Sequence, residues 1–553
     1  MPRNSSQWVT HRINGGWATD YGRTFYGSPE GGSFEIPWCN TCENVRFNPD
    51  GSFGKYPGLD SFLDAPIKAP GGANGFTESS YIRQLYSYVR MGSTLTGTRE
   101  EMVVIGSYLY TITSSILTQI GDLSSSSPAL HQMSTFNDLL IIGTGGSPKS
   151  WDQTTFQLLA GAPPTFEFST PHAGRHWAAG VSSDPYRLYY SAVGNPEDWV
   201  GAGSGSIDID PGDGDAIVGL LSWKRELWVF KGPNRLSIHR ITGSSPSDFA
   251  RVPFTYGVSA AGQQSIFPVG DDFAFWSPRG SCHSLTATDS YGDYTQAYLN
   301  FPILSWCRNS GNLSGGVAGY YWQTVTDFSQ NITYCALNNG FVYDSSNPSV
   351  ILAMDWRFRT DSNPYPRFTQ LNFNRKITAL GLLAGRIEEA QLLPTFGDKD
   401  GWILQESSPN APSFTIDASP LSYTIETPGL TYGPSVETKT VMAVSVDVVS
   451  NYNVLNSAYG SLDLSYGGPG APTQTLTFDT RNGIGLGTFV LGTDQLADGN
   501  ETPGFAENIN GDSRAFAYTL VENSGVSGSR GNDVRVKHFS VQLIPTGESL
   551  ENT

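Results

Sequence analysis

One local pattern recurs through much of the sequence and limits the folds that the chain can adopt. Between about residues 80 and 405, a short strand of alternating aromatic and aliphatic residues is followed by a turn rich in Gly, Asp or Asn, and then by another strand. Examples are SYLYTIT (107–113), NDLLIIGTGG (137–146), YRLYYSAVG (186–194) and RELWVFKG (225–232). Because strong helix formers such as Lys, Glu, Arg and Met are also scarce, the sequence predicts an all-β protein.

The spacing of these units favours a β-propeller. Successive units lie roughly 30 to 70 residues apart, close to the roughly 40 to 50 residues of a four-stranded propeller blade. In RELWVFKG, Leu and Val alternate with Trp and Phe, so both faces of this strand carry large apolar side chains. A strand buried on both faces suits the stacked sheets of neighbouring blades better than a one-sided sheet. A β-sandwich stays open as the alternative for this region.

The chain is predicted to have three parts. Residues 1–60, rich in Gly, Asn and Pro, show no core of their own and are predicted to form an N-terminal arm on the rest of the chain or on a neighbouring subunit. Residues 61–410 are predicted to form the propeller body, with about six blades. Longer alternating strands follow, such as NDVRVKHFSVQLIP (532–545), and predict a C-terminal β-sandwich-like domain over residues 411–553.

The charge balance disfavours one class of partner. The chain has 33 Lys and Arg residues against 51 Asp and Glu, a net charge of −18, and no run rich in Lys or Arg. Specific binding to a nucleic-acid backbone is therefore disfavoured, although an acidic surface can serve nucleic acid by repelling it.

The sequence also predicts where the chain is made. Its N-terminus lacks the apolar core of a secretory signal, and no stretch is long and apolar enough to span a membrane. Its 5 Cys residues are scattered, which argues against a disulfide framework. We expect a soluble protein with reduced cysteines, made in a cytosol and not inserted in a membrane.

The segment 189–220, YYSAVGNPEDWVGAGSGSIDIDPGDGDAIVGL, is the strongest candidate for a site. Its alternating carboxylates suggest a calcium loop, and those of the acidic turn are Asp208, Asp210, Asp213 and Asp215. A loop of the EF-hand type starting at Asp208 requires an oxygen ligand at its fifth position, Gly at its sixth and Glu at its twelfth, but the chain has Gly, Asp and Gly there. The favoured interpretation is a strand–turn–strand junction, with Asp capping local N–H groups. A calcium site of another type stays open.

Other candidate ligands and catalytic motifs are weak. Cys39 and Cys42 form a lone C-x-x-C motif, which could bind a metal ion or have a redox role. His11 could be a further ligand only if the fold brings it close to these cysteines. His172 and His176 have the i, i+4 spacing of a helical metal pair, but nearby Pro and Gly argue against a helix. We find no P-loop, nucleophile elbow or sialidase-type turn. We therefore predict no catalytic residues, metal or cofactor and no enzyme activity. A glycosidase requires only two carboxylates from distant parts of the chain, and the sequence does not exclude such a pair.

Two stretches together resemble a known family. The first is IPWCNTCENVRFNPDGSFGKYPG (36–58), with an Asn-Val pair and a basic residue before Pro-Gly. The second joins RHWAAGVSSDPYRLYYSAVGNPEDW (175–199) to IDIDPGDGDAIVGLLSWKRELWVFK (207–231). They resemble the tail nozzle or tail hub proteins of short-tailed bacteriophages, also called tail tubular protein B or stabilisation protein. The structural turn of this signature comprises Gly194, Asn195, Pro196, Asp198 and Trp199. Tyr56, where family members often have Arg, and the Cys pair depart from the family pattern.

The resemblance implies a structural role in the virion tail. It implies a β-propeller body with added β-domains that assembles as a ring, commonly a homo-hexamer, lining and closing the channel for genome ejection. The implied partners are further copies of the chain, the tail adaptor near the portal, tail fibres or spikes, and viral DNA in transient, non-specific passage. An acidic lumen would repel that DNA, and the four carboxylates of the acidic turn are candidates to face it.

Two other functions stay open from the sequence. One is a carbohydrate-binding or glycan-cleaving β-propeller of a tailspike or secreted enzyme, which the 13 Trp residues and the many carboxylates favour. The other is a tail-tip or capsid-accessory structural protein of a longer-tailed phage.

Overall fold

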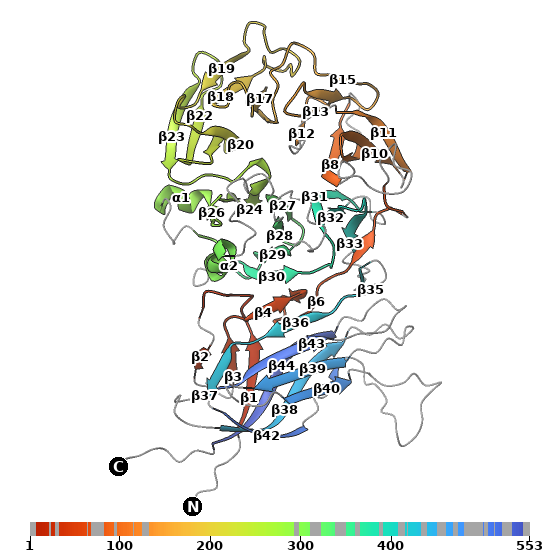
Figure 1. The fold of residues 1–553 in the computed structure, drawn as a ribbon, viewed down its shortest axis with the longest axis vertical. Helices are drawn as coiled ribbons and strands as arrows, with labels where there is room; N and C mark the ends of the chain where they lie inside the picture. Colours follow the sequence, from red (N-terminus) through yellow and green to blue (C-terminus); the bar gives the residue numbers. More distant parts are fainter. Residues whose placement is uncertain are drawn as a thin grey trace, which may run out of the picture.

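The computed structural model describes most of the chain, and its ordered elements are almost all strands (Figure 1). The helices among the described residues are short: η2 (Gln263–Ser265), α1 (Leu285–Tyr291), η4 (Phe301–Ile303) and α2 (Leu304–Asn309). None of them is long and apolar enough to cross a membrane. The described residues are 7–21, 24–27, 33–63, 65–67, 82–92, 97–113, 116–123, 132–291, 298–309, 322–337, 350–359, 365–385, 391–407, 415–416, 419–432, 439–450, 461–467, 474–479, 501–502, 507–513, 515–522 and 534–545.

A β-propeller occupies the upper part of Figure 1, and its first four blades are antiparallel meanders of four strands. The first two blades are β8 (Ile82–Arg90), β9 (Thr98–Ile105), β10 (Tyr108–Thr113) and β11 (Ile116–Asp122), then β12 (Gln132–Phe136), β13 (Leu139–Gly143), β14 (Lys149–Trp151) and β15 (Phe156–Leu158). The next two are β16 (Phe168–His172), β17 (Arg175–Ala179), β18 (Arg187–Tyr190) and β19 (Gly205–Asp208), then β20 (Ala216–Trp223), β21 (Glu226–Gly232), β22 (Ser237–Thr242) and β23 (Ala250–Tyr256). Pairing between sequence neighbours explains the strand–turn–strand pattern of the sequence.

Two further four-stranded blades complete the propeller. The fifth consists of β27 (Trp322–Asp327), β28 (Ile332–Leu337), β29 (Val350–Asp355) and β30 (Arg367–Leu371). The sixth consists of β31 (Ile377–Ala384), β32 (Leu392–Asp398), β33 (Ile403–Glu406) and β7 (Leu59–Ser61). A narrower three-stranded sheet lies between the fourth and fifth blades: β24 (Ile266–Val269), β25 (Asp272–Trp276) and β26 (Cys282–Ser284). The predicted all-β propeller is confirmed, and the sandwich alternative for this region is wrong.

The ring of blades closes through the N-terminal part of the chain. Strand β7 precedes the first blade in sequence but pairs antiparallel with β33 of the sixth. Between the sixth and first blades the backbones approach closely, since a Cβ atom on Gly381 of β31 would lie 2.6 Å from the Cβ atom of Leu85 in β8. A side chain at position 381 would therefore push these two blades apart.

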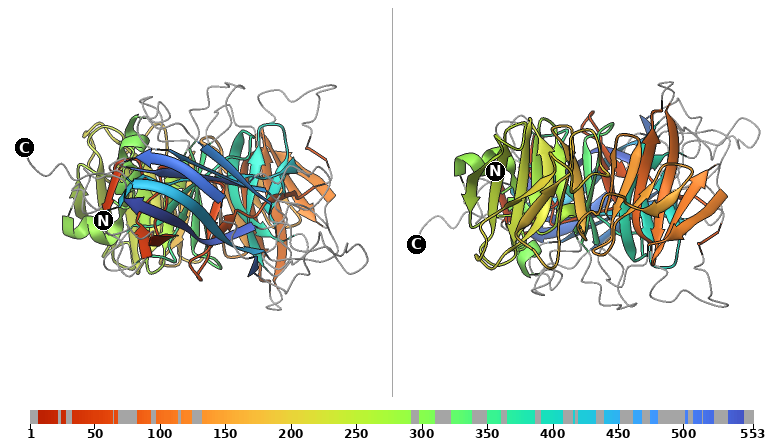
Figure 2. Two further views of the ribbon diagram at one scale, coloured as in Figure 1. Left: turned by 90° about the horizontal axis from the view of Figure 1, so that it is seen from below. Right: turned by 90° about the horizontal axis from the view of Figure 1, so that it is seen from above.

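The remaining strands form two facing sheets at the lower end of the molecule (Figures 1 and 2). One sheet contains β1 (Gln7–Ile13), β3 (Ser33–Ile36), β5 (Val45–Phe47), β6 (Phe53–Lys55), β38 (Lys439–Ser450), β41 (Glu501–Thr502), β42 (Glu507–Ser513) and β44 (Val534–Pro545). The other continues the fifth blade through β4 (Thr41–Glu43), β36 (Tyr423–Glu426), β43 (Ala517–Glu522), β39 (Ser461–Gly467) and β40 (Gln474–Asp479). A short pair adds β2 (Thr24–Gly27) with β37 (Gly429–Tyr432). The strands β34 (Thr415–Ile416) and β35 (Ser419–Pro420) extend the sheet of the sixth blade, because β34 pairs with β7.

The predicted arm connects the propeller to the C-terminal strands. Strand β1 pairs with β44 through Gln7 to His11, and β4 lies between β30 of the propeller and β36. In the core between the two sheets, Val9 and Ile13 of the arm belong to one buried cluster with Tyr518 and Phe539 of the C-terminal strands. The arm thus buries its apolar side chains in a core shared with the C-terminal strands. The predicted boundaries after residues 60 and 410 stay predictions.

Candidate functional site

The acidic turn of the signature lies at a crossover between two blades. Asp208 ends β19, the outer strand of the third blade, and the chain then passes through residues 209–215 to β20, which opens the fourth blade. Within this turn the backbone φ angles are 41° at Asp210, 88° at Gly212 and 84° at Gly214. Positive φ angles at the two Gly positions cost little, which explains why a tight crossover uses them.

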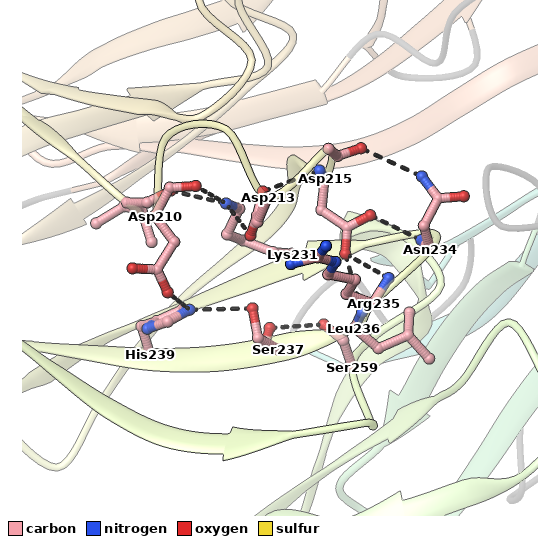
Figure 3. A network of polar contacts seen from close by, with 12 residues as sticks. Asp210, Asp213, Asp215, Lys231, Asn234, Arg235, Leu236, Ser237, His239 and Ser259 are labelled. Carbon is pink, nitrogen blue, oxygen red and sulfur yellow. Dashed lines mark hydrogen bonds and ion pairs between the residues drawn. The ribbon is translucent and has the colours of Figure 1, made fainter.

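The ammonium group of Lys231 is the centre of this turn (Figure 3). Lys231 lies on β21, and its side chain is fully buried. Its Nζ atom donates to the backbone carbonyl oxygens of Ile209 and Asp210 at 2.7 and 3.0 Å, and to Asp213 Oδ2 at 2.6 Å. A cation held by carbonyl and carboxylate oxygens resembles a calcium site in its ligands. Here the chain supplies the cation itself.

Asp215 fastens the turn to the following hairpin (Figure 3). Its carboxylate accepts hydrogen bonds from the backbone N–H groups of Asn234 at 2.7 Å, Arg235 at 2.8 Å and Leu236 at 2.9 Å. These residues connect β21 to β22, so one buried carboxylate satisfies three donors that the tight connection leaves without strand partners.

The other two carboxylates are paired with cations. Asp208 accepts two hydrogen bonds from Arg187, at 2.6 Å from Nε and 3.1 Å from Nη2, and this contact lowers the pKa of Asp208. Asp210 pairs with Arg251, and its Oδ2 lies 3.5 Å from Nε2 of the buried His239. Burial lowers the pKa of His239 to about 4, so this imidazole is neutral near pH 7.

The turn is therefore close to electrically balanced. Burial raises the pKa of Asp213, but the hydrogen bonds from Lys231 and from the N–H of Asp215, together with the nearby charges of Lys231 and Arg235, outweigh burial, and the pKa of Asp213 is lowered. Three cationic side chains thus pair with three of the four carboxylates, and the fourth, Asp215, accepts from backbone N–H groups. The structure brings the four predicted residues together as an internal brace, and their predicted position on a channel wall stays a prediction.

The Gly-Asn-Pro-x-Asp-Trp turn anchors the third blade to the second. Trp199 is 8% exposed and packs with Ile141, Leu159 and Phe166 of the second blade and its crossover. Its indole N–H donates to the carbonyl oxygen of Pro196 at 2.8 Å.

Asp198 and Asn195 shape the backbone around Trp199. The carboxylate of Asp198 accepts from the N–H of Gly201 at 2.8 Å, and the amide oxygen of Asn195 accepts from the N–H of Glu197 at 3.0 Å. Gly194 supplies a φ of 69°, and its carbonyl oxygen accepts from Asn137 of the second blade at 2.6 Å. Each of the five residues of the predicted structural turn thus has a packing or hydrogen-bonding role.

The candidate metal ligands lie in separate environments. His172 and His176 are on the neighbouring strands β16 and β17 and not on a helix, as expected. Burial lowers the pKa of His176 to about 3 and raises that of the Cys42 thiol to about 12. His11 contacts Tyr432, with its Nε2 atom 2.7 Å from the tyrosine hydroxyl. Within the described ranges, no group of three His, Cys, Asp or Glu residues could hold a metal ion.

Sequence reasoning missed a second buried polar cluster, centred on Glu406. Its side chain is 1% exposed, and Oε2 accepts from the hydroxyl groups of Tyr56 at 2.7 Å and Tyr334 at 2.8 Å. Arg46 Nη1 lies 4.0 Å from Oε1. Tyr56, which departs from the pattern of the resembled family, contributes one of the two hydroxyl groups that satisfy this carboxylate. The only sequence signal was that departure itself.

Comparisons with known proteins give no family. No family model matches the chain, and no curated protein matches it. Among solved structures, BBS1N from its complex with ARL6DN is 13% identical, with a TM-score of 0.36, 64% of this chain and 99% of that chain covered. An exo-β-1,3-galactanase from Phanerochaete chrysosporium with galactose is 9% identical, with a TM-score of 0.24, 87% of this chain and 100% of that chain covered. Likenesses this distant carry no information on function.

The fold and the site define an all-β protein built on a β-propeller. Within it, the acidic turn is held by internal ion pairs and backbone hydrogen bonds.

Proposed function

We propose that this chain is a structural virion protein that forms a ring, the nozzle or hub, at the distal part of a short phage tail. In this role it lines and closes the channel for genome ejection and contacts the tail adaptor and the fibres or spikes. The observation that carries the proposal is the contact between Lys231 and Asp213, 2.6 Å apart. It joins the acidic turn to Val229, Phe230 and Lys231 of β21, and both elements lie in the second stretch of the family resemblance.

The first stretch of the resemblance supports the same role. Residues 36–58 contribute β4, β5 and β6, and β4 pairs with both the propeller strand β30 and the C-terminal strand β36. A segment that fastens two parts of the chain together suits a protein that must transmit load without changing shape.

The net charge of −18 supports a channel wall that does not bind DNA. Because the carboxylates of the acidic turn have internal partners, we infer that the repulsion comes mainly from other acidic side chains, whichever loops face the lumen.

Deletion of the gene in the phage that encodes it, with complementation from a plasmid, tests this proposal. We expect particles without a complete tail that lose DNA, and restoration by the wild-type chain. Particles with complete tails and retained DNA in the uncomplemented deletion would refute it.

A second candidate function is a glycan-binding β-propeller, which an aromatic pocket beside the fifth blade favours. An assay for release of reducing sugars from glycans separates binding from cleavage, and the nozzle proposal predicts no release above background.

A further inference from the structure

A pocket of about 710 Å³ lies where the N-terminal segment meets the fifth blade. Its walls come from stretches far apart in the sequence: residues 15–18, 20–21 and 37–38 of the predicted arm, residues 301–302 of η4, and residues 365–367 at the start of β30. Ligand sites in proteins typically have volumes of about 300–1,000 Å³. The pocket therefore has room for a molecule of one to three sugar rings.

Half-buried aromatic side chains line this pocket. The rings of Tyr21 and Trp38 meet edge to face with centroids 5.2 Å apart. The rings of Phe301 and Tyr365 stack at 5.9 Å, with 24° between their planes. Each of the four is only partly covered by the rest of the chain. The faces of such rings carry partial negative charge and attract the C–H groups on the apolar face of a pyranose.

Close backbone contacts hold the pocket in shape. A Cβ atom on Gly15 would lie 1.6 Å from the carbonyl oxygen of Pro37, so only Gly lets these two segments touch. The N–H groups of Thr19 and Asp20 both donate to the carbonyl oxygen of Pro302, at 2.8 and 3.1 Å. A pocket fixed in this way binds without the entropy cost of ordering its walls.

One acceptor and one donor group line the same pocket. Asp20 accepts from the N–H of Ser305 at 2.8 Å and from the hydroxyl of Thr19 at 3.1 Å, and a carboxylate has about four acceptor positions, so capacity remains. Arg367 belongs to the same lining, and its guanidinium stacks on Phe358, 3.8 Å from the ring centroid. A guanidinium has five N–H donors in the plane of the group, so stacking on a ring leaves them directed outward.

We propose that this pocket binds a neutral saccharide. Opposite charges on Asp20 and Arg367 give no net attraction for an anion or a cation, and burial lowers the pKa of Arg367 to about 10. A hydrocarbon would remove water from both charged groups without offering them a hydrogen bond in exchange. A pyranose places C–H groups on the aromatic faces and offers hydroxyl groups to both the carboxylate and the guanidinium. The inference does not depend on ring assembly, so its failure would leave the proposed virion role intact.

A glycan array probed with the full-length chain, followed by titration of the best neutral oligosaccharide, tests the inference. We expect Trp38→Ala and Tyr365→Ala each to weaken binding by about tenfold or more. Trp8→Ala removes an aromatic ring that is 42% exposed and outside the pocket, and should leave binding unchanged. Arg367→Lys keeps the charge but loses the planar donors, and should also weaken binding.

The same measurements can overturn the inference. Circular dichroism and the unfolding midpoint identify variants that fail to fold, and Phe301→Leu then serves as a milder change in the same wall. The proposal is wrong if no neutral glycan binds the wild-type chain, if binding survives both aromatic variants, or if a proline-rich peptide binds the pocket in place of a saccharide.

Discussion

The Nζ atom of Lys231 lies 2.6 Å from Asp213 Oδ2, and the lysine side chain is completely buried. Lys231 lies on the propeller strand β21, and Asp213 lies on the crossover that leads into the same blade. The loop has the composition of a calcium site, but the ammonium group of Lys231 takes the place of the metal ion. The stability and the ion dependence of this region follow from that contact.

Replacement of Lys231 by Met should destabilise the fourth blade. The change keeps most of the side-chain volume but leaves Asp213 and two carbonyl oxygens without their donor, and loss of one partner of a buried pair costs about 3 kcal/mol. Denaturant unfolding followed by tryptophan fluorescence measures the loss in free energy of unfolding. Lys224→Met, at an exposed lysine of the adjacent hairpin, is the control and should cost about 0.5 kcal/mol or less.

Calcium should have no effect on this region. The ammonium of Lys231 already contacts the oxygens that would bind a cation, at 2.6 to 3.0 Å. We expect the unfolding midpoint of the wild-type chain to be the same in millimolar calcium and in EDTA. A midpoint that rises with calcium and loses this rise in Asp213→Asn would show that the turn binds the ion.

Trp199 should stabilise the contact between the second and third blades. Its ring is 8% exposed in a cluster with Ile141, Leu159 and Phe166, and removal of a buried Trp side chain costs about 3 kcal/mol or more. The neighbouring Val200 is 77% exposed, so Val200→Ala is a matched control with little expected effect. Equal losses of unfolding free energy in Trp199→Ala and Val200→Ala would contradict the anchoring role.

Stability should depend on pH through Glu406. Burial raises the pKa of this carboxyl above its ordinary value, so its contribution is fully present below the unfolded pKa and declines as pH rises through the folded pKa. Glu406→Gln keeps an oxygen acceptor and cannot ionise, so we expect its stability relative to the wild type to increase as pH rises across that window. A difference between the two that stays constant with pH would show that folding does not raise the pKa of Glu406.

The all-β class and the propeller could be predicted because they depend on local patterns. Each blade pairs sequence neighbours, so its strands and turns are visible as alternation and as Gly, Asp and Asn clusters. The sequence did not predict that the sheet β24–β26 has three strands and not four. Its strands and turns show the same alternation and the same Gly and Asp clusters as those of a four-stranded blade.

Contacts between distant segments could not be predicted. The pairing of β7 with β33 and of β1 with β44 joins opposite parts of the chain, and no local periodicity specifies which edges meet. The acidic turn was correctly interpreted as strand, turn and strand, but its buried cationic partner, Lys231, was not predicted. The available signal was Lys231 itself, a charged residue at the end of an apolar strand, where burial requires a partner.

Electron cryo-microscopy of virions that carry a tagged copy of this chain would show directly whether the chain forms a tail ring. We expect a closed ring of copies, six in the expected assembly, around the channel at the distal end of a short tail, with the tag on each copy. A tag found on single, isolated copies, or at a site away from the tail channel, would contradict it.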